Sequence, residues 1–371
     1  MNFIINCSNL KQGGGLQVGD SVCRELVNYS HHHFIVVLST AFNETASAVR
    51  DYPNVEVVIH DIKNDLRTIL LGRDALLDSI VKEKKIDAVL TIFGPSRWRP
   101  RCKHLCGFAR AQLLIGSEFI SSSSFISGLK QLFKYNIWKW AFKRSSNTFF
   151  TENQYISDML PGLLGDVKVY TVTNYYNQVF DECEKWKEKR LPAFEGTTLL
   201  TISNAYPHKN MEIAAAVSHI LVNKYPDFNF RFVFSIEREQ YHADINGIED
   251  HFVFLGKVNI KECPSLYKQC DIAFQPTLME CFTATYPEAM RMGVPIVTTD
   301  LEFARGLCGD AACYYRAIDA EAAAKAIYKV ATEKEYSSRL VENGRRQLLT
   351  YDNYEQRAEK LLSILEEIAR K

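Results

Sequence analysis

The sequence predicts an α/β protein built from two Rossmann-like, doubly wound domains in series. Short apolar runs typical of buried parallel strands alternate with helical patterns, and this alternation starts a second time past the middle of the chain. A glycine triplet follows the first strand, and a charged, turn-rich segment separates the two series. The length of 371 residues is typical of two domains. Ligands are expected in a cleft between the two domains.

The composition indicates a globular protein without a nucleic-acid partner. The chain is 47% hydrophobic, and its 44 Lys and Arg residues balance 44 Asp and Glu residues. Ten cysteines without a Cys-x-x-Cys pair predict reduced thiols in a cytoplasmic protein. The first six residues are typical of a strand and lack the features of a signal peptide. No apolar run approaches the ~20 residues of a membrane-spanning helix.

The first domain is predicted to cover residues 1–175. Helical patterns separate its strands, one of them directly after the glycine triplet and another ending near Lys84. Its expected strands, each a short apolar run, are 3–7, 34–38, 55–59, 88–93, 112–115, 148–151 and 167–172.

The second domain is predicted to cover residues 176–353. It begins with the charged segment 181–196, which we expect to be surface structure, and a solvated helix with no role beyond linking is the favoured interpretation. The last segment, 354–371, has apolar residues at helical spacing, and we expect this helix to pack back on the first domain. The expected strands of the second domain are 198–202, 230–234, 252–255, 272–275, 295–298 and 313–315.

Two glutamates eight residues apart, Glu280 and Glu288, lie in a stretch that reads as strand, loop, helix and strand. Because Pro287 belongs in the first turn of a helix, Glu280 is expected in the loop and Glu288 in that first turn. Ligands of open parallel sheets bind at the carboxyl ends of the strands. The two carboxylates would then reach different parts of one extended ligand; two surface carboxylates are the alternative.

Lys209 and the glycine triplet are the other candidate ligand contacts. Lys209 follows the first strand of the second domain at an expected helix start, where its charge opposes the helix dipole unless an anion binds there. A solvated loop lysine is the alternative. Gly13, Gly14 and Gly15 let the backbone approach a phosphate or sugar, or form a flexible turn. They do not complete the Gly-x-Gly-x-x-Gly fingerprint of dinucleotide-binding folds.

Together these motifs resemble the retaining glycosyltransferases of family 4, also called glycosyl transferases group 1, which have the two-Rossmann GT-B fold. The family signature Glu-x7-Glu is present, with Pro-Thr upstream and Ala-Met-Arg-Met-Gly-Val-Pro-Ile-Val after the second glutamate. The resemblance covers most of residues 198–350, whereas the first domain matches only through its glycine loop. Other family-like segments are 207–210, 254–258 and 309–312.

The resemblance implies a retaining hexosyltransferase that moves a sugar from a nucleotide-diphosphate sugar to a saccharide or lipid-linked saccharide. The setting would be the synthesis of a cell-surface polysaccharide or lipopolysaccharide. The first domain would bind the acceptor and the second the donor.

The resemblance also assigns residue roles. Lys209 would neutralise the diphosphate, Glu280 would hold a hydroxyl of the donor sugar, and Glu288 would hold the ribose hydroxyls. No cofactor is expected, and no metal, since the chain has no Asp-x-Asp motif. The further donor-binding candidates are Asn204, Gly256, Lys257, Val258, Cys281 and, at the expected start of the helix, the amides of Phe282 and Thr283.

The chain departs from the family pattern at three places. Ser203 and Asn204 stand where the family has an arginine before the lysine, and Arg305 is a candidate replacement cation. Thr283 stands where the family has a glycine. The family's first-domain histidine has no clear counterpart, and the segment around Glu118 is the candidate for its place. An epimerase-like enzyme without an acceptor, or a non-catalytic sugar-nucleotide-binding protein, is therefore the alternative function.

Two basic, aromatic segments bear on the acceptor. One is the loop 97–104, with Arg97 and Arg99, and the other is the expected helix 131–144. A core helix with basic edges is the favoured interpretation of the second segment. A basic aromatic helix can also lie on an anionic membrane, which would suit a lipid-linked acceptor at the inner face of the membrane. Both segments could instead shape a site for an anionic acceptor.

Two histidine- or cysteine-rich segments are interpreted without a metal. The three histidines at 31–33 are typical of a solvated loop, and Cys102, His104 and Cys106 lack a fourth ligand.

Overall fold

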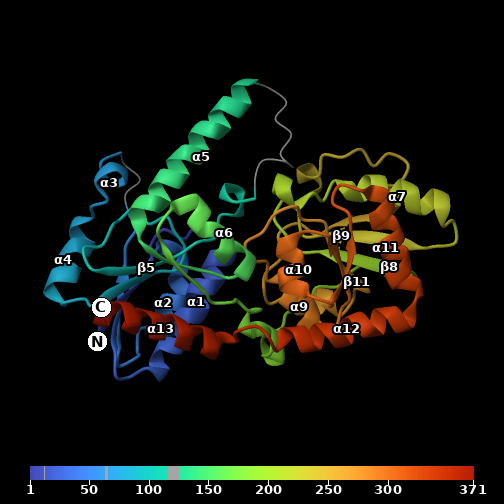
Figure 1. Cartoon of the computed structure of the whole chain (residues 1–371). Coiled ribbons are helices and arrows are strands. Elements are labelled where there is room, and N and C mark those ends of the chain that lie inside the picture. The colour runs from blue at the N-terminus through green and yellow to red at the C-terminus, as the bar shows by residue number, and fades with distance from the viewer. Residues whose placement is uncertain (12, 63–65, 116–124) are drawn as a thin grey trace. The chain divides into compact units, whose positions relative to one another are not determined.

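A computed structural model describes residues 1–11, 13–62, 66–115 and 125–371 of the chain (Figure 1). The described residues form two compact units. Unit 1 comprises residues 1–115, 125–174 and 352–371, and unit 2 comprises residues 175–351. Each unit holds one parallel sheet flanked by helices, which confirms the predicted α/β class.

Unit 1 is built on a seven-stranded sheet in which all neighbouring strands are parallel. Its strands are β1 (Asn2–Cys7), β2 (His33–Leu38), β3 (Val55–Ile59), β4 (Ala88–Thr91), β5 (Lys103–Gly107), β6 (Thr148–Thr151) and β7 (Lys168–Thr171). The strand order is β3-β2-β1-β4-β5-β6-β7. The direction of winding therefore reverses between β1 and β4, the place where doubly wound sheets bind ligands outside the carboxyl ends of their strands.

The helices of unit 1 include the C-terminal one, α13, which lies beside α1 (Figure 1). Leu361 and Leu365 of α13 are fully buried in one apolar cluster with Phe3 and Ile5 of the sheet. The α-helices are α1 (Gly14–Glu25), α2 (Asn43–Val49), α3 (Leu66–Leu71), α4 (Ala75–Glu83), α5 (Phe125–Ser145), α6 (Gln154–Leu164) and α13 (Tyr354–Arg370). Short 3₁₀ helices are η1 (Leu26–Asn28), η2 (Thr40–Phe42) and η3 (Ala111–Leu113).

Unit 2 is built on a six-stranded sheet, also parallel throughout. Its strands are β8 (Thr197–Thr201), β9 (Phe230–Phe234), β10 (Phe252–Phe254), β11 (Ile272–Gln275), β12 (Ile296–Thr299) and β13 (Ala312–Tyr315). The order β10-β9-β8-β11-β12-β13 reverses between β8 and β11. The second sheet therefore repeats the winding of the first, with its own ligand-binding edge.

Four α-helices of unit 2 lie between its strands in the manner of βα units, and the last two follow β13 (Figure 1). The α-helices are α7 (Ile213–Lys224), α8 (Cys263–Tyr267), α9 (Thr285–Met292), α10 (Glu302–Cys308), α11 (Ala320–Thr332) and α12 (Lys334–Leu348). The 3₁₀ helices are η5 (Gln178–Phe180), η6 (Cys183–Lys185), η7 (Pro207–Lys209), η8 (Arg238–Gln240) and η9 (Glu249–His251).

The prediction of a strand at 112–115 was wrong. That segment holds the 3₁₀ helix η3, and the strand at this place in the sheet is β5. The sequence of β5 does not predict a strand, because Lys103 and His104 interrupt its apolar residues. His104 is nevertheless buried, and its ring nitrogens contact the Thr91 hydroxyl at 2.9 Å and the Ser145 carbonyl at 2.8 Å. A polar residue with both nitrogens partnered can occupy a central strand.

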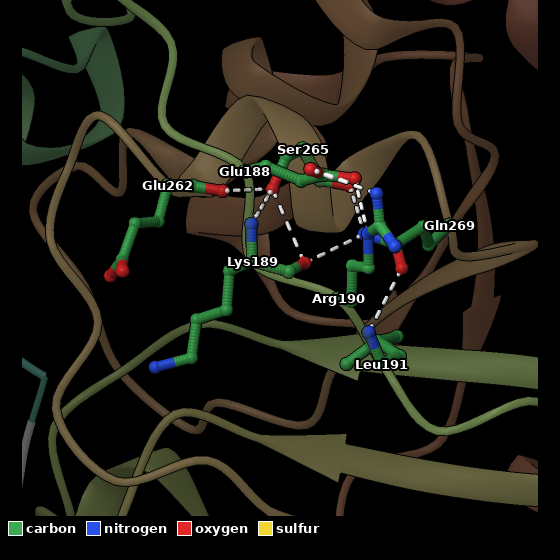
Figure 2. A network of polar contacts seen from close by, with 7 residues as sticks. All are labelled: Glu188, Lys189, Arg190, Leu191, Glu262, Ser265 and Gln269. Atoms are coloured by element: carbon green, nitrogen blue, oxygen red, sulfur yellow. Dashed lines mark hydrogen bonds and ion pairs between the residues drawn. The ribbon is translucent and has the colours of Figure 1, made fainter.

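The charged segment 181–196 lies along α8, where its main chain forms hydrogen bonds with the side chains of Ser265 and Gln269 (Figure 2). The Lys189 N–H donates to the Ser265 hydroxyl at 2.9 Å, and the Gln269 amide donates to the Lys189 carbonyl at 2.8 Å. The Leu191 N–H donates to the other end of the Gln269 amide at 2.9 Å. This segment therefore has a defined path although it forms neither an α-helix nor a strand.

A buried charged cluster fastens α13 to the sheet of unit 1. Arg357 of α13 is buried and donates to the side chain of Asn174, and Glu152, directly after β6, is buried beside them. Burial raises the pKa of Glu152 to about 7, and the positive charge of Arg357 opposes that rise. Arg357 therefore offsets part of the cost of burying this carboxyl group.

We expect Arg357→Met to lower the free energy of unfolding by about 2–4 kcal/mol at pH 7, because it removes the buried cation that offsets the burial of Glu152 and donates to the Asn174 side chain. Without Arg357 the folded-state pKa of Glu152 rises further, so the cost of burying Glu152 extends to higher pH. The difference from the unchanged protein should therefore grow as pH rises above 7. Denaturant unfolding followed by tryptophan fluorescence measures it, since Trp98, Trp138 and Trp140 lie in unit 1.

The control is Arg370→Met, which removes an exposed cation that pairs with Glu366 on the same helix. Exposed pairs contribute about 0–1 kcal/mol, so this variant should unfold almost as the unchanged protein does. Equal effects of the two substitutions would contradict a stabilising role of the buried cluster.

Candidate active site

Two loops meet at the carboxyl edge of the sheet of unit 2, where the strand order reverses. The loop after β11 is tied to the loop after β8 by a hydrogen bond from the Leu278 N–H to the His208 carbonyl at 2.7 Å. Lys209 Nζ forms an ion pair with Glu280 Oε1, and the Thr277 hydroxyl donates to the same oxygen at 3.0 Å. The structure therefore brings together the two residues to which the family resemblance assigns the diphosphate and a hydroxyl of the donor sugar.

The Lys209–Glu280 pair is largely shielded from solvent, with side-chain exposures of 16% and 12%. An ammonium group carries three N–H donors, and Glu280 engages one of them, so donors remain for an anion. Burial and the charge of Lys209 lower the pKa of the adjacent His208, which keeps that imidazole uncharged at neutral pH. The local positive charge is therefore carried by Lys209.

The predicted place of Lys209 at the start of an α-helix was wrong. Lys209 ends the short 3₁₀ helix η7, the next residue, Asn210, has a left-handed backbone with φ +50°, and α7 begins only at Ile213. Asn is one of the few non-glycine residues that adopts this conformation readily. The helix dipole therefore gives no reason to expect an anion at Lys209. The ion pair with Glu280 fixes the position of the Lys209 ammonium group instead.

Glu288 lies in the first turn of α9, as predicted, but it is no surface carboxylate. It is 4% exposed and accepts a hydrogen bond from the Tyr267 hydroxyl at 3.2 Å. Burial raises the pKa of Glu288 to about 7, and the hydrogen bond from Tyr267 opposes the rise. Sequence analysis missed Tyr267, because its role depends on α8 packing against α9. A buried carboxylate with one modest donor can accept further hydrogen bonds from a ligand.

The three residues after Glu280 lie in the loop ahead of α9. Cys281 and Thr283 are buried, and Phe282 lies edge-on to the Tyr351 ring at 6.0 Å between centroids. The prediction that the amides of Phe282 and Thr283 lie at the helix start was wrong by two to three residues, since α9 begins at Thr285. The Thr283 and Thr285 hydroxyls are hydrogen-bonded at 2.9 Å, which shapes the entry to the helix.

The remaining donor-site candidates lie after β8 and β10. Asn204 and Lys257 are exposed, whereas Val258 is half-buried. Gly256 has φ +66°, and a Cβ atom built there would overlap the carboxylate of Glu237. In the part of the chain that the structure describes, none of these four candidates makes a hydrogen bond or ion pair with Lys209, Glu280 or Glu288. They share an edge of the sheet with the pair rather than a direct contact.

Arg305, the candidate replacement cation, is already engaged. Its guanidinium pairs with both oxygens of Asp300, at 2.5 and 2.9 Å, and lies over the Tyr314 ring at 4.4 Å. Its charge is therefore largely neutralised within unit 2.

The glycine triplet of unit 1 leaves open space ahead of α1. Gly13 has φ +77° and precedes the helix, and a Cβ atom added at Gly13 or Gly14 would meet no atom within 4 Å. Gly15 packs against Leu10 and Phe93. The first turn of α1 is thus accessible to a ligand at the carboxyl end of β1.

The acceptor-side candidates are placed only in part. Arg97 and Arg99 follow β4 and line a cavity of about 380 Å³ in unit 1, together with Arg110, which sequence analysis missed, and Arg144. Glu118 lies outside the described residues.

The interpretation of 131–144 as a core helix was wrong for most of its described part. Four apolar side chains of α5 are each at least 40% exposed, and α5 extends away from the sheet of its unit (Figure 1). They are Leu132, Phe133, Ile137 and Trp140. Among the apolar side chains of α5 that the structure describes, from residue 132 onward, only Phe142 is fully buried. Within the described residues, no helix combines the length and apolar character needed to cross a membrane.

The histidine and cysteine segments differ in their capacity for a metal. Both ring nitrogens of His104 have protein partners, and burial lowers its pKa to about 4. The ligand atoms of His31, His32 and Glu366 lie within 4.8 Å of one another, and His32 contacts Glu366 at 2.9 Å. That the histidines hold no metal stays a prediction.

Comparison with known proteins places this geometry in a known fold. Residues 183–347 match the family model described as glycosyl transferases group 1. Among solved structures, sucrose-phosphate synthase from Thermosynechococcus elongatus superposes with a TM-score of 0.70 at 13% identity, over 99% of this chain and 98% of that chain. WaaG, a glycosyltransferase involved in lipopolysaccharide biosynthesis, gives 0.67 at 15% identity, over 98% and 99%. The chain has the GT-B fold.

Two further matches differ in how much of the chain they cover. Anabaena Alr3699/HepE, in complex with UDP and glucose, has the GT-B fold in common with this chain, at a TM-score of 0.65 and 13% identity over 99% of both chains. An uncharacterized glycosyltransferase of Haemophilus influenzae is 28% identical over 113 residues, which span 30% of this chain and 31% of that protein. The segment that matches the family model lies within unit 2 and contains Lys209, Glu280 and Glu288.

We expect Gly256→Ala to destabilise unit 2 by about 1–1.5 kcal/mol, because the left-handed backbone strains the new side chain and the end of the exposed Glu237 side chain must also shift slightly. Gly247→Ala is the matched control, since Gly247 has φ +79° but no atom within 4 Å of an added Cβ. That control should cost about 1 kcal/mol, the backbone contribution alone. Thermal unfolding measures both variants, and equal losses would show that the Glu237 contact is irrelevant.

Proposed function

We propose that the protein is a retaining hexosyltransferase whose unit 2 binds a nucleotide-diphosphate sugar. The observation that carries the proposal is the shielded Lys209–Glu280 pair at the reversal point of the second sheet, inside the segment that matches the group 1 family model. The structural neighbour that holds UDP and glucose supports the class of donor. The acceptor, a saccharide or lipid-linked saccharide, is assigned to unit 1.

In this proposal Lys209 faces the diphosphate of the donor. Departure of a diphosphate builds negative charge on the leaving oxygens, and a fixed ammonium group in a shielded site stabilises that charge more than water does. Glu280 holds Lys209 in place before the donor arrives and accepts a hydroxyl of the donor sugar when it is bound. The two residues act on neighbouring parts of one ligand, which fits their direct contact.

The proposed transfer step involves one bond formed and one bond broken at the anomeric carbon. The acceptor hydroxyl oxygen bonds to that carbon, and the bond from the carbon to the diphosphate oxygen breaks, with its electron pair staying on the diphosphate. The hydroxyl proton passes to the departing oxygen on the same face, so the configuration is retained. The products are the glycoside and a nucleoside diphosphate. The residues assigned to this step include no metal ligand, and no cofactor is assigned.

Glu288 is proposed to accept hydrogen bonds from the two ribose hydroxyls of the nucleotide. An ionised carboxylate accepts two such donors, whereas a protonated one accepts fewer and competes with its own proton. The burial of Glu288 makes its ionised form costly unless a ligand donates hydrogen bonds to it, so ribose binding and ionisation are coupled.

The biological setting is proposed to be the synthesis of a cell-surface polysaccharide or lipopolysaccharide on the cytoplasmic side of the membrane. The structural likeness to WaaG and the exposed apolar side chains of α5 support this setting. The apolar residues of α5 could rest on the membrane surface while the acceptor stays attached to its lipid.

The proposal is tested with the full chain, a panel of nucleoside diphosphates and their sugars, and two measurements: thermal stabilisation and release of free nucleotide. We expect one base to stabilise the protein. Lys209→Met should weaken nucleotide binding and lower turnover by about 10²–10³-fold, because the leaving group loses its countercharge. Lys224→Met, which removes an exposed lysine paired with Glu321 in the same unit, should leave both unchanged. If no nucleoside diphosphate bound, the donor assignment would be wrong.

We also expect the affinity for the nucleoside diphosphate to depend on the ionisation of Glu288. Below pH 7 the free protein holds a proton on Glu288 that binding must release, so affinity should fall by up to about tenfold per pH unit. Above pH 7 this dependence should vanish. The phosphates of the ligand titrate in the same way whether it binds the unchanged protein or the Glu288→Gln variant. The difference between the pH profiles of affinity of the two proteins, measured by calorimetric titration, therefore reports Glu288 alone. Identical pH profiles would exclude it as the ribose carboxylate.

A further inference from the structure

A cavity of about 380 Å³ lies in unit 1 at the reversal point of its sheet. Its walls come from the loops after β1, β4 and β5 and from the C-terminal half of α5. The volume falls within the range of small-molecule sites, about 300–1,000 Å³. The glycine triplet is close by, since Gly15 packs against Phe93, the residue before cavity-lining Gly94.

Four arginines line this cavity: Arg97, Arg99, Arg110 and Arg144. No aspartate or glutamate is among the described residues of its wall, and within the described chain none of the four arginines forms an ion pair. A second cavity of about 330 Å³ also borders Arg99 and adds Arg101 to the same region. Uncompensated positive charge therefore gathers at one point of a chain whose overall charge is zero.

Tryptophans, rather than carboxylates, hold two of these arginines. The Arg110 guanidinium lies 3.6 Å from the Trp138 ring centroid, and that of Arg144 lies 5.1 Å from the Trp140 centroid. Such contacts orient the guanidinium plane without neutralising its charge or using its N–H donors. Burial lowers the pKa of Arg110, yet an arginine stays charged at neutral pH. Arg110 is half-buried, so its unpaired charge is partly desolvated at a cost, and an anion in the cavity would offset that cost.

Two neutral polar side chains in the wall each have one buried oxygen without a hydrogen-bond partner among the described residues. Ser96 is 8% exposed, and its hydroxyl has no hydrogen-bond partner among the described residues. The Asn9 amide donates to the Phe93 carbonyl at 2.5 Å, while its buried oxygen accepts nothing within the described chain. Buried polar atoms without partners are uncommon in native proteins. Hydroxyl groups of a sugar are suitable partners for both.

We propose that this cavity binds the phosphate group of a phosphorylated sugar acceptor, with arginines on the phosphate and Asn9 and Ser96 on sugar hydroxyls. The inference rests on the proposed function, because it gives the substrate class of the acceptor half. Arginine binds phosphate through two parallel N–H donors, and several arginines suit a doubly charged phosphate better than a single carboxylate. The ring faces of the tryptophans suit the apolar face of a sugar.

The phosphate could belong to a soluble sugar phosphate or to a lipid-linked saccharide. The second source is consistent with α5, whose exposed Ile137 and Trp140 also line the cavity. The chemistry recognised is the same in both cases: a sugar next to a phosphate ester.

The test is calorimetric titration of the full chain with hexose monophosphates, the matching free hexoses, glucuronate and inorganic phosphate. Flotation with phosphatidylcholine vesicles, with and without a polyprenyl-phosphate-linked sugar, tests the lipid source. We expect a sugar phosphate or the doped vesicles to bind, free hexoses not to bind, and binding to weaken as salt rises. Equal binding of a hexose with and without its phosphate, or a preference for glucuronate, would overturn the proposal.

Variants at two of the three half-buried arginines, Arg97 and Arg144, localise the binding. Arg97→Gln and Arg144→Gln should each weaken binding of the sugar phosphate or doped vesicle about 10–100-fold, the loss expected for one charged contact. Arg144→Lys, which keeps the charge but loses the paired donors, should fall in between. Arg50→Gln removes an exposed arginine of the same unit and should change nothing. Unchanged binding in the first two variants would exclude this cavity.

Nucleotide binding separates this inference from the proposed function. The arginine variants should keep the affinity of the unchanged protein for nucleoside diphosphate, which also shows that they are folded. If nucleotide binds and no phosphorylated sugar or doped vesicle does, the cavity assignment is wrong and the donor assignment stands. If the reverse is observed, the transferase proposal is wrong and the phosphate site stands.

Discussion

The ion pair between Lys209 and Glu280 is the interaction on which the candidate active site depends. It joins the loops after β8 and β11, the two strands between which the winding of the second sheet reverses. A crevice opens outside the carboxyl ends of the strands where the strand order reverses. Contacts between side chains are therefore needed to hold the two loops that border it together. The hydrogen bond from Leu278 to the His208 carbonyl adds a main-chain tie. The candidate site is therefore ordered by the same residues that are proposed to contact the donor.

The two units hold positive charge in contrasting ways at equivalent places in their sheets. In unit 2, the cation at the reversal point has a carboxylate partner, and Arg305 is likewise matched by Asp300. In unit 1, Arg110 and Arg144 rest on tryptophan rings instead. A carboxylate partner neutralises a cation until a ligand competes for it, whereas an aromatic face leaves the charge in place. The first arrangement suits a site where charge develops during reaction, and the second suits permanent recognition of an anion.

Buried carboxyl groups with pKa values raised to about 7 occur in both units. Glu152 follows β6 in unit 1, and Glu288 opens α9 in unit 2. Burial is the cause in each case, but the surroundings differ. Glu152 faces Arg357 and Asn174, which hold α13 against the sheet, whereas Glu288 has the Tyr267 hydroxyl as its side-chain partner. A raised pKa alone therefore does not mark a functional group, and the supply of protein partners distinguishes the structural carboxyl from the candidate ligand-binding one.

The sequence by itself determined the α/β class, most strand positions, the C-terminal helix and the pair of glutamates around Pro287. These follow from apolar periodicity and from proline and glycine chemistry, which act over a few neighbouring residues. It could not locate β5, because His104 breaks the apolar pattern and is tolerated only through partners on other segments. Only the tertiary structure decided that Lys209 contacts Glu280, that Tyr267 reaches Glu288, and that four arginines from three segments share one cavity. Each of these contacts joins residues distant in the chain, and packing of the sheets and helices, rather than local propensity, brings such residues together.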